Sequence, residues 1–170
     1  YKTISKPVIS MKSLTEKSYE TELNAIKALL PELDEIIHKI RADNQFKIER
    51  KAKNDLVTSA DLASEAFIVN RLSELFPDDV IWAEENHAQP EELDQRIWII
   101  DPIDGTTNFS HGFAPYCVSI ALWDRTELVL GLVYELAHKQ CFYATKGQGA
   151  YLDGTVLSVS PCTQPEDSLI

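Results

Sequence analysis

Acidic residues in three short segments carry the clearest chemical signal in this chain. The first segment, residues 101–109, reads D-P-I-D-G-T-T-N-F and follows the apolar run at residues 97–100. Its carboxylates Asp101 and Asp104 lie at i and i+3 at the end of a predicted buried strand, where they repel each other unless a cation lies between them. Oxygen ligands of this kind suit a hard cation such as Mg²⁺.

The same segment has features of an anion-binding turn. Pro102 removes a backbone donor, and Gly105 allows another backbone or a ligand to approach closely. The amides of Gly105 and Thr106 can open a helix whose N-terminus receives a phosphate. The alternative is an Asx turn that caps a helix and leaves its carboxylates in water. The complete motif behind an apolar strand favours the metal-and-phosphate interpretation.

Two further acidic positions gain meaning only beside this motif. Glu84-Glu85 follows the apolar run 80–83, and alone it is typical of a solvated strand end. If that strand neighbours the strand at 97–100, the two acidic ends converge on one metal. Asp61, in D-L-V-T-S-A-D, is either a first-turn carboxylate favoured by the helix dipole or a group that holds water beside the metal. The sequence leaves both interpretations open.

Helices are predicted in the N-terminal half. Apolar residues recur at steps of three and four over residues 23–40, which is typical of an amphipathic helix, and Pro31 should kink or divide it. Thr58 and Ser59 offer an N-cap for a second helix, which ends before Pro77.

The pattern then changes to short apolar runs separated by turn residues, of which Asp153-Gly154 is the strongest hairpin signal. Short connections without helical crossovers predict an antiparallel meander. The fold class is therefore α+β, with N-terminal helices packed on an antiparallel sheet. The predicted strands are residues 80–83, 97–100, 116–123, 128–134, 141–145, 150–152 and 156–159.

Length and composition indicate the number of domains and exclude several classes of partner. The 170 residues fit a single domain over residues 1–170. Asp plus Glu number 27 against 16 Lys plus Arg, a net charge of −11, which disfavours nucleic acid and anionic membranes as partners. The 3 cysteines lack C-x-x-C spacing, so reduced thiols and a cytoplasmic location are expected. No apolar run approaches the roughly 18 residues of a membrane helix.

Together these motifs resemble the inositol monophosphatase family of metal-dependent, lithium-sensitive phosphatases. The resemblance rests on D-P-I-D-G-T-T-N-F after W-I-I, on A-E-E and on D-L-V-T-S-A-D, and it extends to F-A-P-Y-C-V-S-I and K-G-Q-G-A-Y-L-D-G. It implies that the chain forms the first half of a layered α/β sandwich. It also implies an enzyme that hydrolyses a small phosphate monoester with Mg²⁺ and that is commonly a homodimer. Inositol monophosphate is the leading substrate, and 3′-phosphoadenosine 5′-phosphate and fructose 1,6-bisphosphate are the alternatives.

The resemblance also implies roles for individual residues. The Mg²⁺ ligands would be the side chains of Glu84, Asp101 and Asp104 and the carbonyl of Ile103. Thr106 would orient the attacking water together with Glu84. Asp61 would hold a metal-bound water. Asp104 and the backbone amides of Gly105 and Thr106 would contact the phosphate. One Mg²⁺ would lower the pKa of the water, and a second would stabilise the leaving oxygen.

Two departures from the family pattern stand out. Ala83 replaces the glycine that usually precedes the glutamate pair. The family's C-terminal half supplies a W-D-x-A segment whose Asp completes the second metal site, whereas Trp123-Asp124 is followed here by Arg-Thr. We therefore expect the N-terminal half only, with the C-terminal domain absent. The alternative of another class is a catalytically incomplete metal-binding or interaction fragment.

Overall fold

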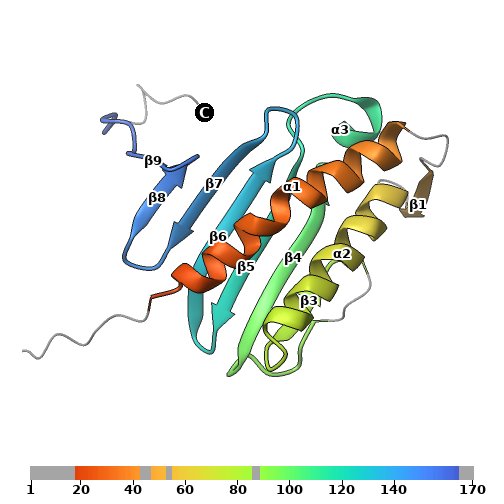
Figure 1. Cartoon of the computed structure of the whole chain (residues 1–170). Helices are drawn as coiled ribbons and strands as arrows, with labels where there is room; N and C mark the ends of the chain where they lie inside the picture. Colours follow the sequence, from red (N-terminus) through yellow and green to blue (C-terminus); the bar gives the residue numbers. More distant parts are fainter. Residues whose placement is uncertain (1–17, 43–46, 53–54, 86–88, 165–170) are drawn as a thin grey trace, which may run out of the picture.

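Two helices pack on one face of a seven-stranded sheet (Figure 1). The computed structural model describes residues 18–42, 47–52, 55–85 and 89–164, with the side chains of residues 50–57 left out. Within these ranges, no helix has the length and apolar character needed to cross a bilayer.

Helix α1 (Glu20–Ala42) runs without division through Pro31. Pro31 is exposed, whereas Leu30 and Leu33 on either side are buried in the core. The apolar stripe packed against the sheet keeps this segment helical, although the proline lacks the N–H that would bond to the preceding turn. Of the two effects predicted for Pro31, a kink or a division into two helices, the division is therefore wrong.

Helix α2 (Ser59–Leu75) begins with a capping box at Thr58 and Asp61. The Thr58 hydroxyl accepts from the amide of Asp61, and the Asp61 carboxylate accepts from the amide of Thr58 at 2.9 Å. At the other end the amide of Phe76 donates to the carbonyl of Leu72. The predicted second helix and its N-cap are confirmed.

The large sheet follows the order of the chain from β3 to β9. From β4 onward every neighbouring pair is antiparallel, as predicted. The strands are β3 (Val80–Ala83), β4 (Arg96–Asp104), β5 (Cys117–Asp124), β6 (Glu127–Glu135), β7 (Gln140–Thr145), β8 (Gly149–Leu152) and β9 (Thr155–Val156).

Strand β3 departs from the prediction, because it pairs with β4 in parallel, Val80 opposite Ile97 and Ala83 opposite Ile100. The intervening chain is long enough to return to the starting end of the sheet, so β4 enters from the same side as β3. The sheet is therefore mixed rather than antiparallel throughout. Strand β9 is also shorter than the predicted strand at 156–159.

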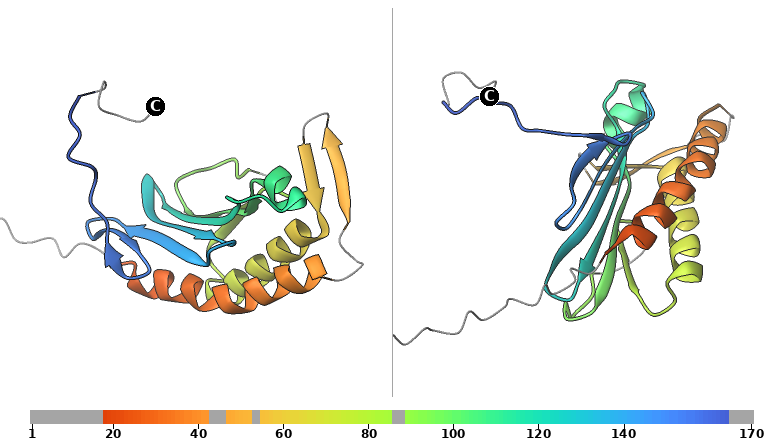
Figure 2. Two further views of the ribbon diagram at one scale, coloured as in Figure 1. Left: turned by 90° about the horizontal axis from the view of Figure 1, so that it is seen from above. Right: turned by 60° about the vertical axis from the view of Figure 1, so that its left-hand side comes forward.

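A second, two-stranded sheet consists of β1 (Ile48–Ala52) and β2 (Asp55–Thr58). The sequence pattern does not predict these strands. The hairpin stands at the end of the molecule that holds the short helix α3 (Thr106–His111), and β2 contacts α3 (Figure 2).

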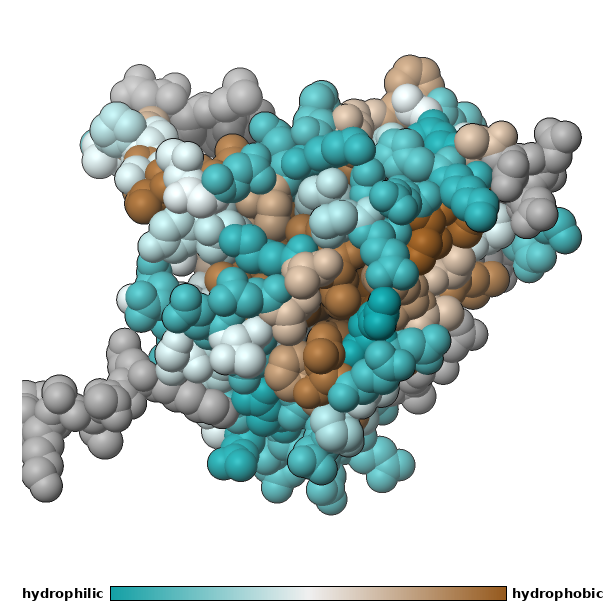
Figure 3. All heavy atoms as spheres, in the orientation of Figure 1, coloured by the Kyte–Doolittle hydropathy of each residue, from teal (hydrophilic) through white to brown (hydrophobic). Residues whose placement is uncertain are grey.

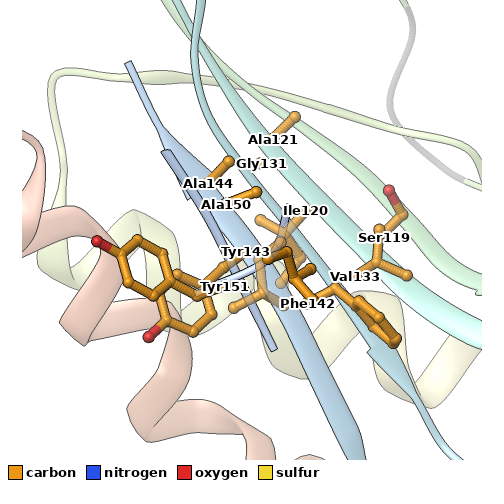
Figure 4. Close-up of a pocket in the computed structure, with 12 residues that line it drawn as sticks. Ser119, Ile120, Ala121, Gly131, Val133, Phe142, Tyr143, Ala144, Ala150 and Tyr151 are labelled. Atoms are coloured by element: carbon orange, nitrogen blue, oxygen red, sulfur yellow. The ribbon is translucent and has the colours of Figure 1, made fainter. Parts of the chain in front are cut away.

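The core lies between the helices and the sheet. Trp98, Ile120 and Leu132 are fully buried there, and hydrophobic residues form a band between α1 and α2 in the space-filling view (Figure 3). No described helix covers the opposite face of the sheet (Figure 2). That face carries a shallow apolar hollow of about 260 Å³, whose lining includes Ala121 and Gly131 (Figure 4).

Candidate active site

The parallel pairing of β3 and β4 brings their acidic ends together. Ala83 lies opposite Ile100, and the amide of Glu84 donates to the carbonyl of Ile100 at 3.2 Å. Glu84 therefore follows its strand at the level where Asp101 follows Ile100. From the sequence, the acidic ends of the two strands are expected to converge if the strands are neighbours, and the parallel pairing of β3 with β4 meets this condition.

Asp101 lies at the centre of this acidic cluster. Its Oδ1 atom is buried and has no hydrogen-bond partner among the described residues. Burial is the largest cause that raises the pKa of Asp101 to about 7, followed by the charge and hydrogen bond of Glu84 and the charge of Asp104. A nearby cation would favour the ionised form of all three carboxylates.

The cluster does not form a closed coordination shell by itself. Across the described ranges, no three His, Cys, Asp or Glu side chains stand in a metal-binding arrangement. Glu84 and Asp104 are exposed, whereas Asp101 is partly buried, so two of the three carboxylates are open to solvent.

A bulge in β4 separates the two aspartates of the motif. The regular pairing with β5 ends at Asp101 opposite Ser119 and resumes at Asp104 opposite Cys117. The Cys117 thiol lies 3.8 Å from Asp104 Oδ2, and burial together with the charges of Asp104 and Asp101 raises its pKa to about 11. The bulge thus directs Asp104 to the end of the sheet, beside a protonated thiol.

The turn within the motif opens a helix, as the sequence predicted. Gly105 is the N-cap residue of α3 at φ +86°, and its carbonyl accepts from the amide of Phe109 at 2.9 Å. A Cβ atom at this position would lie 3.3 Å from the carbonyl oxygen of Pro115. The left-handed backbone and the close approach both require glycine here.

The structure connects Asp61 directly to the motif. The Thr106 hydroxyl lies 3.1 Å from Asp61 Oδ1 and 3.0 Å from the carbonyl of Ile103, so its single proton can be donated to either acceptor. Asp61 is only 1% exposed, and burial raises its pKa although hydrogen bonds from Thr58 and Thr106 act in the opposite direction. Asp61 is thus both a first-turn capping residue and a partner of the motif.

Two residues that contact this region have no assigned role in the sequence analysis. Glu65 is 1% exposed, and its Oε2 accepts from the amide of Glu85 at 2.6 Å. Its position one helical turn after Asp61, on the same buried face, is the signal that could have identified it. Arg41, at the end of α1, donates to the Tyr116 hydroxyl at 3.0 Å and lies over the ring of Phe109 in α3.

Comparisons with known proteins show the family that this chain resembles. Residues 15–170 match the model described as the inositol monophosphatase family. Inositol monophosphatase 2 of Solanum lycopersicum is 42% identical over 127 residues, which cover 72% of this chain and 48% of the relative. A Thermotoga maritima protein named fructose-1,6-bisphosphatase/inositol-1-monophosphatase is 40% identical over 126 residues, which cover 74% and 47%.

Solved structures show the same fold. An IMPase/NADP phosphatase complexed with Mg²⁺ and phosphate superposes with a TM-score of 0.79 at 27% identity, over 87% of this chain and 56% of that one. The chain therefore spans about half the length of the relatives that it matches.

Proposed function

The chain belongs to the inositol monophosphatase family, and from this premise we propose that it supplies the carboxylates and the phosphate-binding turn of a divalent-metal-dependent phosphomonoesterase. The observation that carries the proposal is the buried, unpartnered Oδ1 of Asp101, which lies among carboxylates that raise its pKa. Such an arrangement is costly in the absence of a cation and favourable in its presence.

The donor set fits Mg²⁺ in its chemistry. Glu84, Asp101 and Asp104 offer carboxylate oxygens, and the carbonyl of Ile103 keeps a lone pair besides the one that accepts from Thr106. Bound Mg²⁺ supplies positive charge that lowers the pKa of a coordinated water and stabilises the leaving oxygen. We propose that these residues hold the first metal and that a second site needs a ligand from outside them.

Thr106 and Asp61 are suited to position the attacking water. The single hydroxyl proton of Thr106 can be donated to Asp61 or to the carbonyl of Ile103, and either bond leaves the oxygen lone pairs free to accept from water. The raised pKa of Asp61 makes its carboxylate a better proton acceptor than an exposed one. Together with Glu84, Thr106 would orient the water; as Thr106 accepts a proton from the water it would pass its own hydroxyl proton to Asp61 Oδ1.

The turn at the start of α3 is suited to the phosphate. Gly105 has no side chain to block an approaching oxyanion, and the amides of Gly105 and Thr106 stand beside Asp104 at the end of β4. Phosphate held there would lie next to the carboxylates that hold the metal. This proximity is what hydrolysis by an activated water requires.

We propose inositol monophosphate as the substrate. The names of the plant and bacterial relatives support this choice, and the double name of the Thermotoga relative supports fructose 1,6-bisphosphate as the second candidate. A staphylococcal inositol monophosphatase solved as a LiCl-soaked inhibitory complex supports lithium sensitivity. The 3′-phosphoadenosine 5′-phosphate alternative, the homodimer and the cytoplasmic location stay predictions.

The test combines binding and turnover on the same chain. Inositol 1-phosphate, fructose 1,6-bisphosphate and 3′-phosphoadenosine 5′-phosphate are titrated into the protein with and without Mg²⁺, and phosphate release is followed in parallel. Mg²⁺-dependent binding or hydrolysis of one monoester, weakened in Asp101→Asn, is expected. The absence of both Mg²⁺-dependent binding and Mg²⁺-dependent release for all three compounds would contradict the proposal.

A further inference from the structure

The first two turns of α2 contact both acidic segments of the candidate site. We infer that Glu65 is a positioning residue, which holds the Glu84-Glu85 segment so that the Glu84 carboxylate meets Asp101. The inference rests on the proposed function, because it concerns how this chain prepares its metal-binding carboxylates. Glu65 itself lies behind them, in the core.

The two backbone amides of the glutamate pair are held from different sides. The amide of Glu84 donates to the carbonyl of Ile100 in β4 at 3.2 Å, and the amide of Glu85 donates to Glu65 Oε2 at 2.6 Å. The first bond continues the sheet for one residue beyond β3. The second anchors the chain to α2 where it leaves the sheet, and so fixes the backbone from which the Glu84 side chain projects.

The burial of Glu65 argues against a role in space-filling alone. A carboxylate that is 1% exposed has lost nearly all its water, a cost that an apolar side chain of similar size would avoid. Hydrogen bonds to a carboxylate are about twice as strong as neutral ones, so the short bond from the Glu85 amide offsets part of that cost. A buried carboxyl acceptor at this position is explained if its bond to the glutamate segment has a function.

Helical periodicity gives α2 two anchors on one face. Asp61 and Glu65 stand at i and i+4, and both are 1% exposed. Asp61 accepts from Thr106 of the motif, and Glu65 accepts from the amide of Glu85. One rigid helix therefore fixes the relative positions of two segments that are far apart in sequence.

The consequence for metal binding follows from the exposure of Glu84. Its side chain is exposed, so its orientation toward Asp101 depends on the backbone that carries it. The charge and the hydrogen bond of Glu84 both act on Asp101, which places the two carboxylates close together. When the Glu85 anchor is lost, the Glu84 carboxylate should spend less time in the position that serves a shared cation.

The experiment compares Glu65→Ala with Glu65→Gln, which keeps an acceptor oxygen in the same place. Hydrogen exchange of the Glu85 amide is measured by NMR in the metal-free chain, and Mg²⁺ affinity is measured by calorimetry. Loss of a residue that orients a metal ligand typically lowers affinity by about 10–100-fold, so we expect at least about tenfold weaker binding in Glu65→Ala. Exchange of the Glu85 amide should accelerate in parallel, and Glu65→Gln, which keeps an amide oxygen as a weaker acceptor, should lie between the wild type and Glu65→Ala in both measurements.

Ile68→Val is the matched control, because Ile68 is a fully buried residue of the hydrophobic core on the same helix. It should lower stability without changing Glu85 exchange relative to global unfolding or Mg²⁺ affinity. If Glu65→Ala binds Mg²⁺ as tightly as the wild type, or if Glu65→Gln loses as much affinity as Glu65→Ala, the inference is wrong while the proposed function stands. If the wild type binds no Mg²⁺, the proposed function falls and the inference falls with it.

Discussion

Replacing Asp101 with Asn should stabilise the metal-free fold at neutral pH while removing metal binding. Asp101 is partly buried beside Glu84 and Asp104, and burial and these charges raise its pKa to about 7 from an ordinary value of 3.8. The folded state therefore keeps a proton over a pH range in which the unfolded chain has lost it. Unfolding releases this proton, so the free energy of unfolding decreases as pH rises through this window.

The magnitude follows from the pKa difference. A rise from 3.8 to about 7 corresponds to about 4 kcal/mol at 1.36 kcal/mol per pH unit. Asp101 is only partly buried, so solvent screens the charges around it, and we expect about half of this, roughly 2 kcal/mol. Asn has nearly the same shape and carries no titrating proton. The difference between variant and wild type should therefore be near zero at pH 4 and reach about 2 kcal/mol above pH 7.

Urea unfolding in EDTA at intervals from pH 4 to pH 8 measures this difference directly. Asp94→Asn is the control, since Asp94 is exposed and lies outside the acidic cluster, and it should follow the wild type at every pH. Adding Mg²⁺ should raise the stability of the wild type and leave Asp101→Asn unchanged. A difference that is flat across the pH range, or that favours the wild type at pH 7, would refute the account of Asp101.

Three further substitutions test how the fold supports the site. Gly105→Ala should lower the free energy of unfolding in urea by about 1–3 kcal/mol, because the φ of +86° and the nearby carbonyl exclude a side chain. Gly131→Ala is the control, since no atom lies within 4 Å of the new Cβ, and it should stay within about 0.5 kcal/mol of the wild type. Equal losses in the two variants would contradict this prediction. Arg96→Leu removes the partner of Asp79 at 2.9 Å and should cost about 3–5 kcal/mol by calorimetric or urea unfolding, and a neutral result would show that the ion pair is dispensable. Thr58→Ala removes the α2 cap and should cost about 1 kcal/mol, with an unchanged melting temperature counting against the capping box.

Local turn and cap chemistry made much of the fold predictable. Asp153 and Gly154 both have positive φ, at 48° and 86°, as the hairpin signal requires. The N-cap signal of Thr58 and Ser59 placed the start of α2 correctly, because the hydrogen bonds of a cap form within a few residues. Turns and caps of this kind can be predicted from the sequence because they depend on residues that are close together in the chain.

Features that depend on distant neighbours could not be predicted in the same way. The parallel pairing of β3 with β4 is set by the path of the chain between them, and both strands show the same apolar pattern in either direction. The helix through Pro31 persists because the buried stripe outweighs a local penalty. In each case tertiary packing decided between alternatives that the local sequence left equal.

In the candidate site, too, the residues of the local motif were predicted from the sequence, whereas a residue that depends on a distant contact was not. The motif itself identified Asp101, Asp104 and Thr106, and the structure places them with Glu84 and Asp61 at one end of the sheet. Glu65 carried no motif of its own. Its importance appears only when α2 is placed behind the glutamate pair, since a single buried glutamate in a helix predicts nothing about its partner.

Calorimetric titration of Mg²⁺ into the wild-type chain and into Asp104→Asn tests the central claim most directly. Asp104 is exposed at the end of β4, so its replacement leaves the core intact, and Asp94→Asn again controls for the loss of one negative charge. We predict that the wild type and Asp94→Asn bind Mg²⁺ alike and that Asp104→Asn binds at least about tenfold more weakly. Equal Mg²⁺ affinity in all three proteins would contradict the assignment of these carboxylates to a metal site.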